Sequence, residues 1–253
     1  MYHTYARRAT NGSMFWELAP PIPQRYPNME GRKTTSGSTW KGGRLLDTTD
    51  LDKQHQMDAL RTRALTCPGC PNRDTRFRVV FGEGDVNAKV MLVGQGPGIV
   101  EEQTGRPFAG PSGRLLDQAL AEVGLEREKL WLTNVIKCRA VKSEKGRVVD
   151  RAPSAAELKA CRPWLDGELD IIQPEIIVCI GVPAAKALID KKFKLSEEHG
   201  QVREAPDGTR RTAVFHPAYV LRLRGVDQQA YEQTWRALIA DLRTVVTAMQ
   251  ETA

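Results

Sequence analysis

The sequence predicts an α/β fold with three layers, α/β/α, around a central four-stranded parallel sheet. Short apolar segments alternate with helical patterns from residue 89 onward, which is the order of elements in parallel βαβ units. Each segment is apolar throughout instead of at every second position, which indicates strands that are buried on both faces. A chain of 253 residues, 41% of them hydrophobic and 27% charged, is long enough to bury one such core.

The four predicted strands are short runs of aliphatic and β-branched residues. They cover residues 89–94 (KVMLVG), 130–135 (LWLTNV), 175–181 (EIIVCIG) and 211–215 (RTAVF).

Helices are predicted before and between these strands, where apolar residues recur at helical spacing. The longest predicted helix follows the fourth strand, and the apolar stripe along one of its faces contains Trp235, Leu238 and Leu242. Ser154 and Glu157 have the spacing of a capping box, which places a helix start between them. The predicted helices cover residues 54–65, 112–124, 154–172, 182–189 and 227–249.

The chain before residue 54 has no sustained apolar period and contains PPIPQRYP and TTSGSTWKGG. We therefore predict a flexible or loosely packed N-terminal extension over residues 1–53 and a folded domain over residues 54–253. Aromatic residues such as Trp16 and Trp40 could instead dock on this domain.

Net charge and hydropathy limit the classes of partner that the chain can have. The chain has 37 Lys and Arg against 31 Asp and Glu, a net charge of +6, which is compatible with a polyanion but does not identify one. No apolar run reaches bilayer length, and the first residues lack the apolar core of a secretion signal. We expect a cytoplasmic protein without a membrane partner.

Four of the five cysteines form a candidate ligand set. Cys67 and Cys70 belong to CPGC, Cys138 follows a predicted strand, and Cys161 lies inside a predicted helix. Four thiolates can hold zinc or an iron-sulfur cluster. A redox dithiol is the alternative, but that motif belongs after a strand and here it follows a helix. Cys179, inside a strand, is expected to be an apolar filler.

Three motifs follow strands directly, and strand ends of a parallel sheet form one edge where sites lie. They are GQGPG, TNVIKC and HPAYVLR. Glycines at Gly94 and Gly96 let backbone N–H groups approach a ligand, although they also suit a purely structural turn.

Single side chains near this edge have both functional and structural interpretations. Phe108 suits a stacking platform for a planar ligand, or core filling. Asn134 offers a donor and an acceptor for one edge of a pyrimidine, or caps a turn. His216 stands on a rigid His-Pro turn at the same edge, as a site residue or as a structural imidazole.

Taken in order, these motifs resemble the family 4 uracil-DNA glycosylases, the iron-sulfur branch of the uracil-DNA glycosylase superfamily. The likeness runs over about residues 57–246. It implies a uracil-DNA glycosylase-like fold and a monofunctional enzyme of base-excision repair that flips uracil out of DNA and hydrolyses its N-glycosidic bond. Uracil-containing DNA, single- or double-stranded, is the implied partner of a protein expected to be a monomer. The matching segments are CPGC, GQGPGIVEEQTGRPFAGPSGRLLD, LTNVIKCR, APSAAELKACRPWL and FHPAYVLR.

The resemblance also implies roles for individual residues. Backbone groups around Gln95 and Gly96, after Gly94, would meet a uracil carbonyl and help to place the attacking water. Phe108 would stack on the base, Asn134 would bind its Watson-Crick edge, and His216 would hydrogen-bond its O2 side. Glu101 matches an acidic position near C5 of the base. A 4Fe-4S cluster would be held by Cys67, Cys70, Cys138 and Cys161.

DNA contacts are implied for a loop over residues 219–222, including Tyr219, Leu221 and Arg222, which would press into the duplex. A basic face is expected to hold phosphates in a salt-dependent way. Its candidate members are Arg114, Lys137, Arg139, Arg222 and Arg224.

Two departures from the family pattern bear on activity. Gln95 stands where the family usually has Glu, and a neutral amide cannot act as a base. The loop over residues 141–152 is longer than usual and contains no His, so the covalent reaction of a related uracil-DNA-binding branch is not expected. Whether Asp150 takes a chemical part stays open. The alternatives to a glycosylase are a uracil-DNA binding protein with little or no turnover, and a zinc-bound nucleic-acid scaffold.

Overall fold

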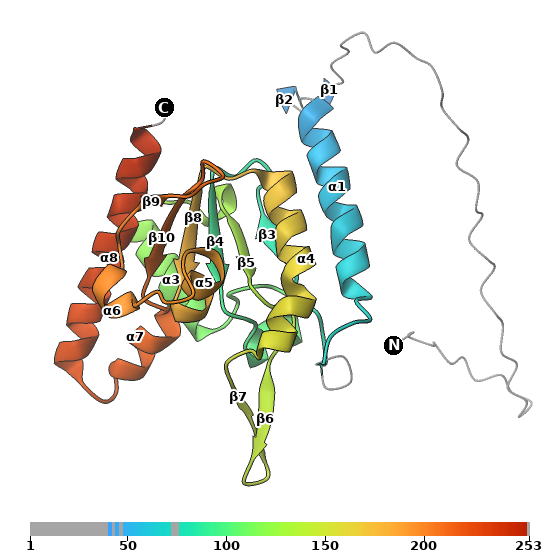
Figure 1. The fold of residues 1–253 in the computed structure, drawn as a ribbon. Coiled ribbons are helices and arrows are strands. Elements are labelled where there is room, and N and C mark those ends of the chain that lie inside the picture. The colour runs from blue at the N-terminus through green and yellow to red at the C-terminus, as the bar shows by residue number, and fades with distance from the viewer. Residues whose placement is uncertain (1–39, 42–43, 46–47, 72–75, 252–253) are drawn as a thin grey trace, which may run out of the picture. The chain divides into compact units, whose positions relative to one another are not determined.

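The structure is a computed structural model that describes residues 40–41, 44–45, 48–71 and 76–251 (Figure 1). These residues belong to one compact unit, Trp40–Ala253. Most of the predicted extension lies outside them, so its boundary stays a prediction. The first helix, α1 (Thr48–Leu65), begins before the predicted start at residue 54. Within the described chain, no helix has the length and apolar character needed to cross a membrane.

The central sheet contains the four predicted parallel strands: β4 (Val90–Gly94), β5 (Trp131–Asn134), β8 (Ile176–Ile180) and β10 (Arg210–Val214). Their order is β5-β4-β8-β10, and all three pairings are parallel. The predicted count of four strands was too low, because a short antiparallel strand extends each edge. These edge strands, β3 (Glu83–Gly84) and β9 (Arg203–Glu204), have two residues each and carry no periodicity that a sequence pattern could detect.

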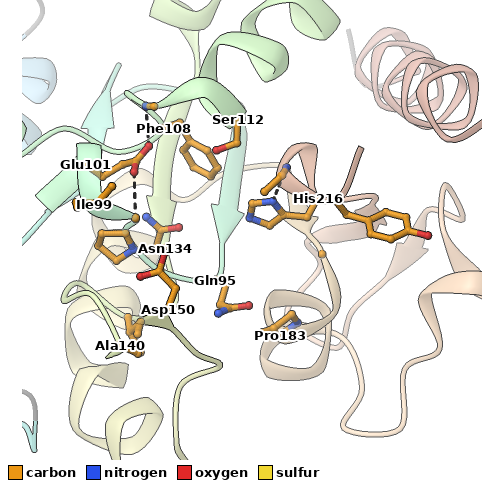
Figure 2. A pocket seen from close by; sticks show the side chains of 18 of the residues that line it. Gln95, Ile99, Glu101, Phe108, Ser112, Asn134, Ala140, Asp150, Pro183 and His216 are labelled. Carbon is orange, nitrogen blue, oxygen red and sulfur yellow. Dashed lines mark hydrogen bonds between the residues drawn. The ribbon is translucent and has the colours of Figure 1, made fainter. Parts of the chain in front are cut away.

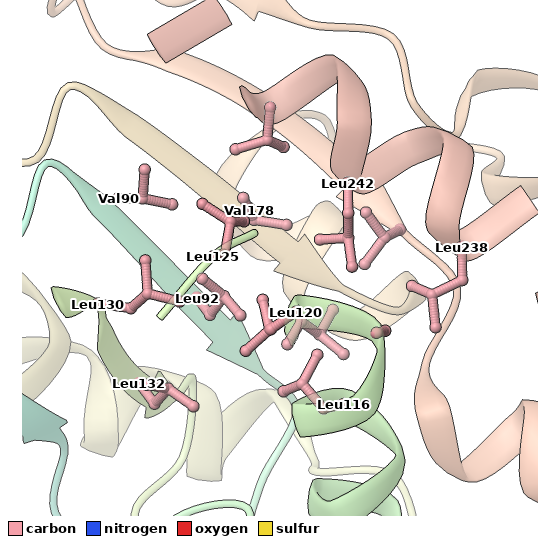
Figure 3. Packing of buried hydrophobic residues seen from close by; sticks show 14 of the residues in the cluster. Val90, Leu92, Leu116, Leu120, Leu125, Leu130, Leu132, Val178, Leu238 and Leu242 are labelled. Atoms are coloured by element: carbon pink, nitrogen blue, oxygen red, sulfur yellow. The ribbon is translucent and has the colours of Figure 1, made fainter. Parts of the chain in front are cut away.

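Both faces of the sheet are covered, which confirms the three layers. Side chains of β4 alternate between two cores: Val90 and Leu92 belong to one, and Met91 and Val93 to the other. The first core is filled from α3 (Pro111–Glu122), α7 (Pro217–Leu223) and α8 (Gln228–Gln250) (Figure 3). The second is filled from α1, α4 (Ala155–Ile172) and α5 (Val182–Leu188).

The predicted helix starts are correct where a side-chain cap specifies them. The Glu157 N–H donates to Ser154 Oγ over 3.3 Å, and the Ser154 N–H donates to Glu157 Oε2 over 2.6 Å, which confirms the capping box. Asp227 caps α8 by accepting the Ala230 N–H over 2.9 Å. Several short elements were not predicted: β1 (Trp40–Lys41), β2 (Arg44–Leu45), α2 (Ile99–Thr104), η1 (Arg127–Lys129) and α6 (Leu195–Glu198).

The insert after Cys138 is a β-hairpin rather than a loop. It consists of β6 (Val141–Glu144) and β7 (Arg147–Asp150), paired in antiparallel register. Lys145 and Gly146 form its turn with φ of 50° and 76°. Two successive positive φ values match a two-residue hairpin turn, and the Lys-Gly pair was the sequence signal for it.

The chain reverses its direction of travel across the sheet between β4 and β8. From β4 it proceeds outward to β5, whereas from β8 it proceeds outward to β10 on the other side. Helix termini and loops are thereby held apart beyond the carboxyl ends of β4 and β8. Ligands of parallel sheets bind at such a switch point.

Candidate active site

A cavity of about 640 Å³ lies at this switch point. Its walls include Gln95 after β4, Asn134 at the end of β5 and His216 after β10, together with Phe108 from the loop before α3. Figure 2 shows the Phe108 ring, the Asn134 amide and the His216 imidazole pointing into this common space. Three motifs that are far apart in the sequence therefore meet in one cavity. Gly96, Glu101, Tyr219 and Arg222 also line it.

Gly94 allows the ring and the amide to approach each other. A methyl group on Gly94 would stand 2.5 Å from Asn134 Oδ1 and 2.7 Å from Phe108 Cζ. Both distances are far below van der Waals contact, so only glycine leaves the two side chains in place. Gly94 is not a cavity wall itself, and its role is to make room for the side chains that are.

Phe108 occupies a strained backbone position. Its φ is 53°, an unusual value for a residue with a large side chain, and only 6% of its surface is exposed. A Cβ on Gly113, in the first turn of α3, would lie 1.7 Å from the Phe108 carbonyl oxygen. The helix start thus packs directly against the Phe108 backbone, and strain held in this way is typical of ligand sites.

Glu101 is buried and joins the two backbone segments on either side of the loop that carries Phe108. Its carboxylate accepts the Gly98 N–H over 3.1 Å and the Gly110 N–H over 2.7 Å, as the dashed lines in Figure 2 mark. Both oxygens are therefore engaged by backbone groups. In this structure Glu101 shapes the wall of the cavity by fixing the turn after β4 to the start of α3.

A buried polar network holds the end of β5, which carries Asn134. Lys137 Nζ donates to the Asn134 carbonyl over 3.0 Å and to Glu168 Oε2 over 2.6 Å. Lys137 is 1% exposed, so its predicted place on a basic DNA-binding face is wrong. Arg139 is similarly enclosed, because it pairs with Asp150 over 2.6 Å and its side chain is 11% exposed.

His216 is the N-cap of α7, and this fixes its tautomer. Its Nδ1 accepts the Ala218 N–H over 3.1 Å, so the proton of the neutral ring resides on Nε2. Burial, reinforced by the nearby Arg222 guanidinium, lowers the pKa of His216 from 6.5 to about 4. The imidazole is therefore neutral at physiological pH and offers one N–H donor to the cavity.

The segment predicted as a loop over residues 219–222 is helical. It lies inside α7, because the Pro at the first helical position and the His216 cap start a helix directly after the turn. Tyr219 is 42% exposed, and the Arg222 guanidinium stands over its ring at 5.9 Å. Leu221 packs against the core instead of lining the cavity.

Gln95 and Asp150 are further polar residues that line the cavity. Gln95 Nε2 donates to the Arg151 carbonyl over 3.4 Å. Asp150 reaches the cavity from the end of the β6–β7 hairpin, where its ion pair with Arg139 holds it. The hairpin, which the sequence showed only as an insert, thus supplies one wall of the site.

Sequence reasoning missed several other walls. Ser112 and Ile99 belong to the starts of α3 and α2, and Val182 and Pro183 to the start of α5. The segment Gly181-Val182-Pro183 follows a strand in the same way as the three recognised motifs, and that position was the available signal. Gly181 has a φ of 85° and lies close to His216, because a Cβ on Gly181 would stand 3.1 Å from the His216 Cβ.

The four predicted thiol ligands lie on three elements. Cys67 and Cys70 follow α1, Cys138 follows β5, and Cys161 lies in α4. Burial raises the pKa of Cys138 to about 11 and that of Cys161 to about 12. In both cases neighbouring thiols, Cys70 among them, add to the rise.

Donor groups point at three of these sulfur atoms. The Lys137 N–H lies 3.0 Å from Cys161 Sγ, Trp164 Nε1 lies 3.3 Å from Cys67 Sγ, and Arg76 Nη1 lies 3.9 Å from Cys138 Sγ. Such donors stabilise thiolate charge. Among the residues that the structure describes, no three His, Cys, Asp or Glu side chains are grouped as ligands of one metal ion. Cys179 is buried in β8, apart from this set.

Comparisons with known proteins agree with this geometry. Residues 81–239 match the family model of the uracil DNA glycosylase superfamily. The chain is 35% identical to the type-4 uracil-DNA glycosylase of Thermotoga maritima, over 68% of this chain and 86% of that protein. It is 35% identical to the enzyme of the same name from Pyrobaculum aerophilum, over 71% and 90%. It is 33% identical to that of Archaeoglobus fulgidus, over 72% and 91%.

Proposed function

The chain belongs to the uracil DNA glycosylase superfamily, and we propose that it removes uracil from DNA by hydrolysing the N-glycosidic bond. The product is an abasic site without strand cleavage, the first intermediate of base-excision repair. The observation that carries this function is the meeting of Phe108, Asn134 and His216 around one cavity at the sheet edge. The names of the similar proteins support the same activity.

Recognition of the base rests on a ring face and an amide. A flipped pyrimidine can stack on Phe108 while the Asn134 amide, with one donor and one acceptor, pairs with its Watson-Crick edge. Extruding the base costs a few kcal/mol, which these contacts offset. The missing side chain of Gly94 leaves room for both groups, since a Cβ there would stand 2.5 Å from Asn134 Oδ1 and 2.7 Å from Phe108 Cζ.

Bond cleavage leaves negative charge on the departing uracil and positive charge on the sugar. The Nε2–H of neutral His216 can donate to the uracil O2, where that negative charge develops. A preorganised donor of this kind is worth about 3 kcal/mol of transition-state stabilisation. Because the pKa of His216 is about 4, the ring donates without first having to lose or gain a proton at neutral pH.

Water is placed by groups around Gln95 and Gly96, which follow β4 directly. Gln95 can orient a water molecule but cannot take its proton. The only carboxylates that line the cavity are Glu101 and Asp150 within the described residues, and both are engaged, by backbone N–H groups and by Arg139. The reaction therefore depends mainly on leaving-group stabilisation, and we expect a modest rate.

Contact with DNA is assigned to α7, where Tyr219 and Arg222 line the cavity and Tyr219 is 42% exposed. The stacked Arg222 and Tyr219 pair offers a phosphate donor and an apolar surface together. A role for Leu221 requires α7 to move, since it packs on the core here.

Cys67, Cys70, Cys138 and Cys161 would hold a 4Fe-4S cluster. The irons of such a cluster bind separate thiolates, so its ligands stand farther apart than those of one zinc ion. The spread of these thiols over three elements, and the N–H donors near three of them, support this fit. The cluster would supply a cross-link between the loop after α1, the end of β5 and α4.

The direct test uses an oligonucleotide with a single uracil, incubated with excess protein and then treated with alkali. Strand breakage at the uracil position is expected for single- or double-stranded substrate, and none for the same oligonucleotide with thymine. Binding without any alkali-labile product from either substrate would establish a uracil-DNA binding protein instead. A monomeric state and a cytoplasmic location remain predictions, which gel filtration and cell fractionation can check.

A further inference from the structure

A second cavity of about 520 Å³ opens beside the first. It lies between α4 and α5, and we call it the α4–α5 cleft. The cleft and the active-site cavity share Val182 and Pro183 as walls, and Ala152 in the cleft directly follows Arg151 in the cavity. An extended ligand that leaves the active-site cavity at either of these points would therefore enter the cleft without crossing a helix or strand.

The rim of the cleft is cationic. Lys159 and Arg162 come from α4, Lys186 from the last turn of α5, and Lys191 from the segment after it. All four side chains are on exposed residues. Arg162 pairs with Asp166 over 2.6 Å and also reaches the Ala187 carbonyl across the cleft, so it bridges the two helices.

The three lysines have no ion-pair partner among the described residues, and no carboxylate lines the cleft. Two lysines elsewhere on the surface do have partners: Lys89 pairs with Glu175, and Lys129 with Glu126. Within the part of the chain that the structure describes, no ion pair offsets the mutual repulsion of Lys159, Lys186 and Lys191. A concentration of unpaired positive charge in a concave site attracts an anionic ligand.

The floor of the cleft is apolar. It is made by Val135, Leu158 and Leu165, with Pro153 and Val182 toward the active site. A free phosphate or another small anion would not use such a floor. A nucleic-acid strand presents both phosphates and flat apolar bases. Grooves that bind single strands combine positive charge with side chains on which the bases lie, most often aromatic ones, and aliphatic side chains and prolines offer that surface here.

We propose that the α4–α5 cleft binds the DNA strand on one side of the flipped nucleotide. Phosphates of this flanking segment contact Lys159, Lys186 and Lys191, while its bases lie against the apolar floor. The proposal deepens the proposed function and rests on it, because it takes the uracil nucleotide to occupy the neighbouring cavity. Which side enters the cleft, 5′ or 3′, is an outcome of the experiment.

The test compares single-stranded oligonucleotides by fluorescence anisotropy. A short one carries uracil with minimal flanks, and two longer ones extend it on the 5′ or on the 3′ side only. The triple variant Lys159→Gln, Lys186→Gln and Lys191→Gln removes the charge of the cleft. The control variant Lys89→Gln, Lys129→Gln and Arg243→Gln removes the same charge, with Lys89 and Lys129 beside the amino ends of strands β4 and β5, away from the cleft.

We expect one extension to tighten binding to the wild-type protein by about tenfold or more at low salt, and the cleft variant to lose this gain. For that oligonucleotide, the plot of log association constant against log salt concentration should be less steep for the cleft variant than for the wild-type protein. The difference in slope should be about 2, the value for three phosphates of a single strand. The control variant should keep both the gain and the slope. A single Lys186→Glu variant should show the same loss and separates the result from any folding defect of the triple variant.

Two outcomes would overturn the proposal. Either no extension improves binding to the wild-type protein, or the cleft variant retains the full gain. Failure of the proposed function is distinguished by the short oligonucleotide, whose excision and binding do not involve the cleft. If the short substrate is cleaved normally by the cleft variant while the extension gain is lost, both inferences stand.

Discussion

Nζ of Lys137 lies 2.6 Å from Oε2 of Glu168, and the two side chains are 1% and 0% exposed. Thr133 Oγ1 lies 2.5 Å from the same Nζ, and Glu168 also accepts the Gly82 N–H over 3.1 Å. This buried pair links α4, which carries Cys161, to the strand end that carries Asn134. The Lys137 N–H also donates to Cys161 Sγ, so one residue contacts both the thiol set and the base pocket.

Lys137→Met should destabilise the fold by about 3–5 kcal/mol, because it leaves the carboxylate of Glu168 buried and uncompensated. Urea unfolding followed by circular dichroism measures the loss. The double variant Lys137→Met and Glu168→Met should recover part of it, since no buried charge remains unpaired. Lys129→Met, which breaks a surface pair, should cost less than about 1 kcal/mol. Equal stability of the Lys137→Met and Lys129→Met variants would contradict a structural role for the buried pair.

His216→Ala should lower single-turnover excision of uracil by about 100-fold or more, because it removes the donor to O2. Asn134→Ala should lower it comparably through the lost edge contact. Visible absorbance of any bound cluster should stay unchanged in both variants, since neither residue belongs to the thiol set. Wild-type rates in both would show that the base binds elsewhere.

Acidification should weaken the fold through His216. Its pKa is about 4 in the folded protein and 6.5 when unfolded, so the unfolded chain binds more protons between these values. Stability from this group is therefore complete above pH 6.5 and falls as the pH drops toward 4, by up to about 3 kcal/mol. Urea unfolding of the protein and of His216→Gln across pH 4–7 isolates the contribution. Parallel curves for the two proteins would refute it.

Gln95→Glu should raise the excision rate by about tenfold or more, because a carboxylate can accept the proton of the attacking water whereas the amide cannot. The variant should also acquire a pH dependence, with the rate falling on the acid side as the introduced carboxylate is protonated. Single-turnover rates between pH 4 and 8 measure both effects, and Gln95→Ala serves as the control for lost contacts. An unchanged rate and profile would mean that residue 95 does not face the water.

Cys138→Ser and Cys161→Ser should lose the iron and the visible absorbance of a purified sample. Cys179→Ala is the matched control, because this buried cysteine in β8 lies outside the thiol set and should leave both signals intact. Iron and sulfide content give the readout independently of activity. Colourless protein that contains zinc would exclude the iron-sulfur cluster.

The parallel strands and the capped helices could be predicted because local signals specify them. Continuous apolar runs identified β4, β5, β8 and β10, and the capping box of Ser154 and Glu157 identified the start of α4. The edge strands and the β6–β7 hairpin were missed. Two-residue strands have no period, and the strands of the hairpin have no buried face, so the Lys145-Gly146 turn was its local signal.

The sequence by itself determined which chemical groups stand at the ends of the strands, because each motif directly follows its strand along the chain. Only the tertiary structure decided what those groups can do. Burial keeps the His216 imidazole neutral, so that it can act as a donor. Lys137 is buried as well, in an ion pair with Glu168. Packing also made Glu101 an acceptor for backbone N–H groups and left the lysines of the α4–α5 cleft without an ion-pair partner in the described part of the chain. Desolvation and pairing depend on neighbours from distant segments, which no local pattern encodes.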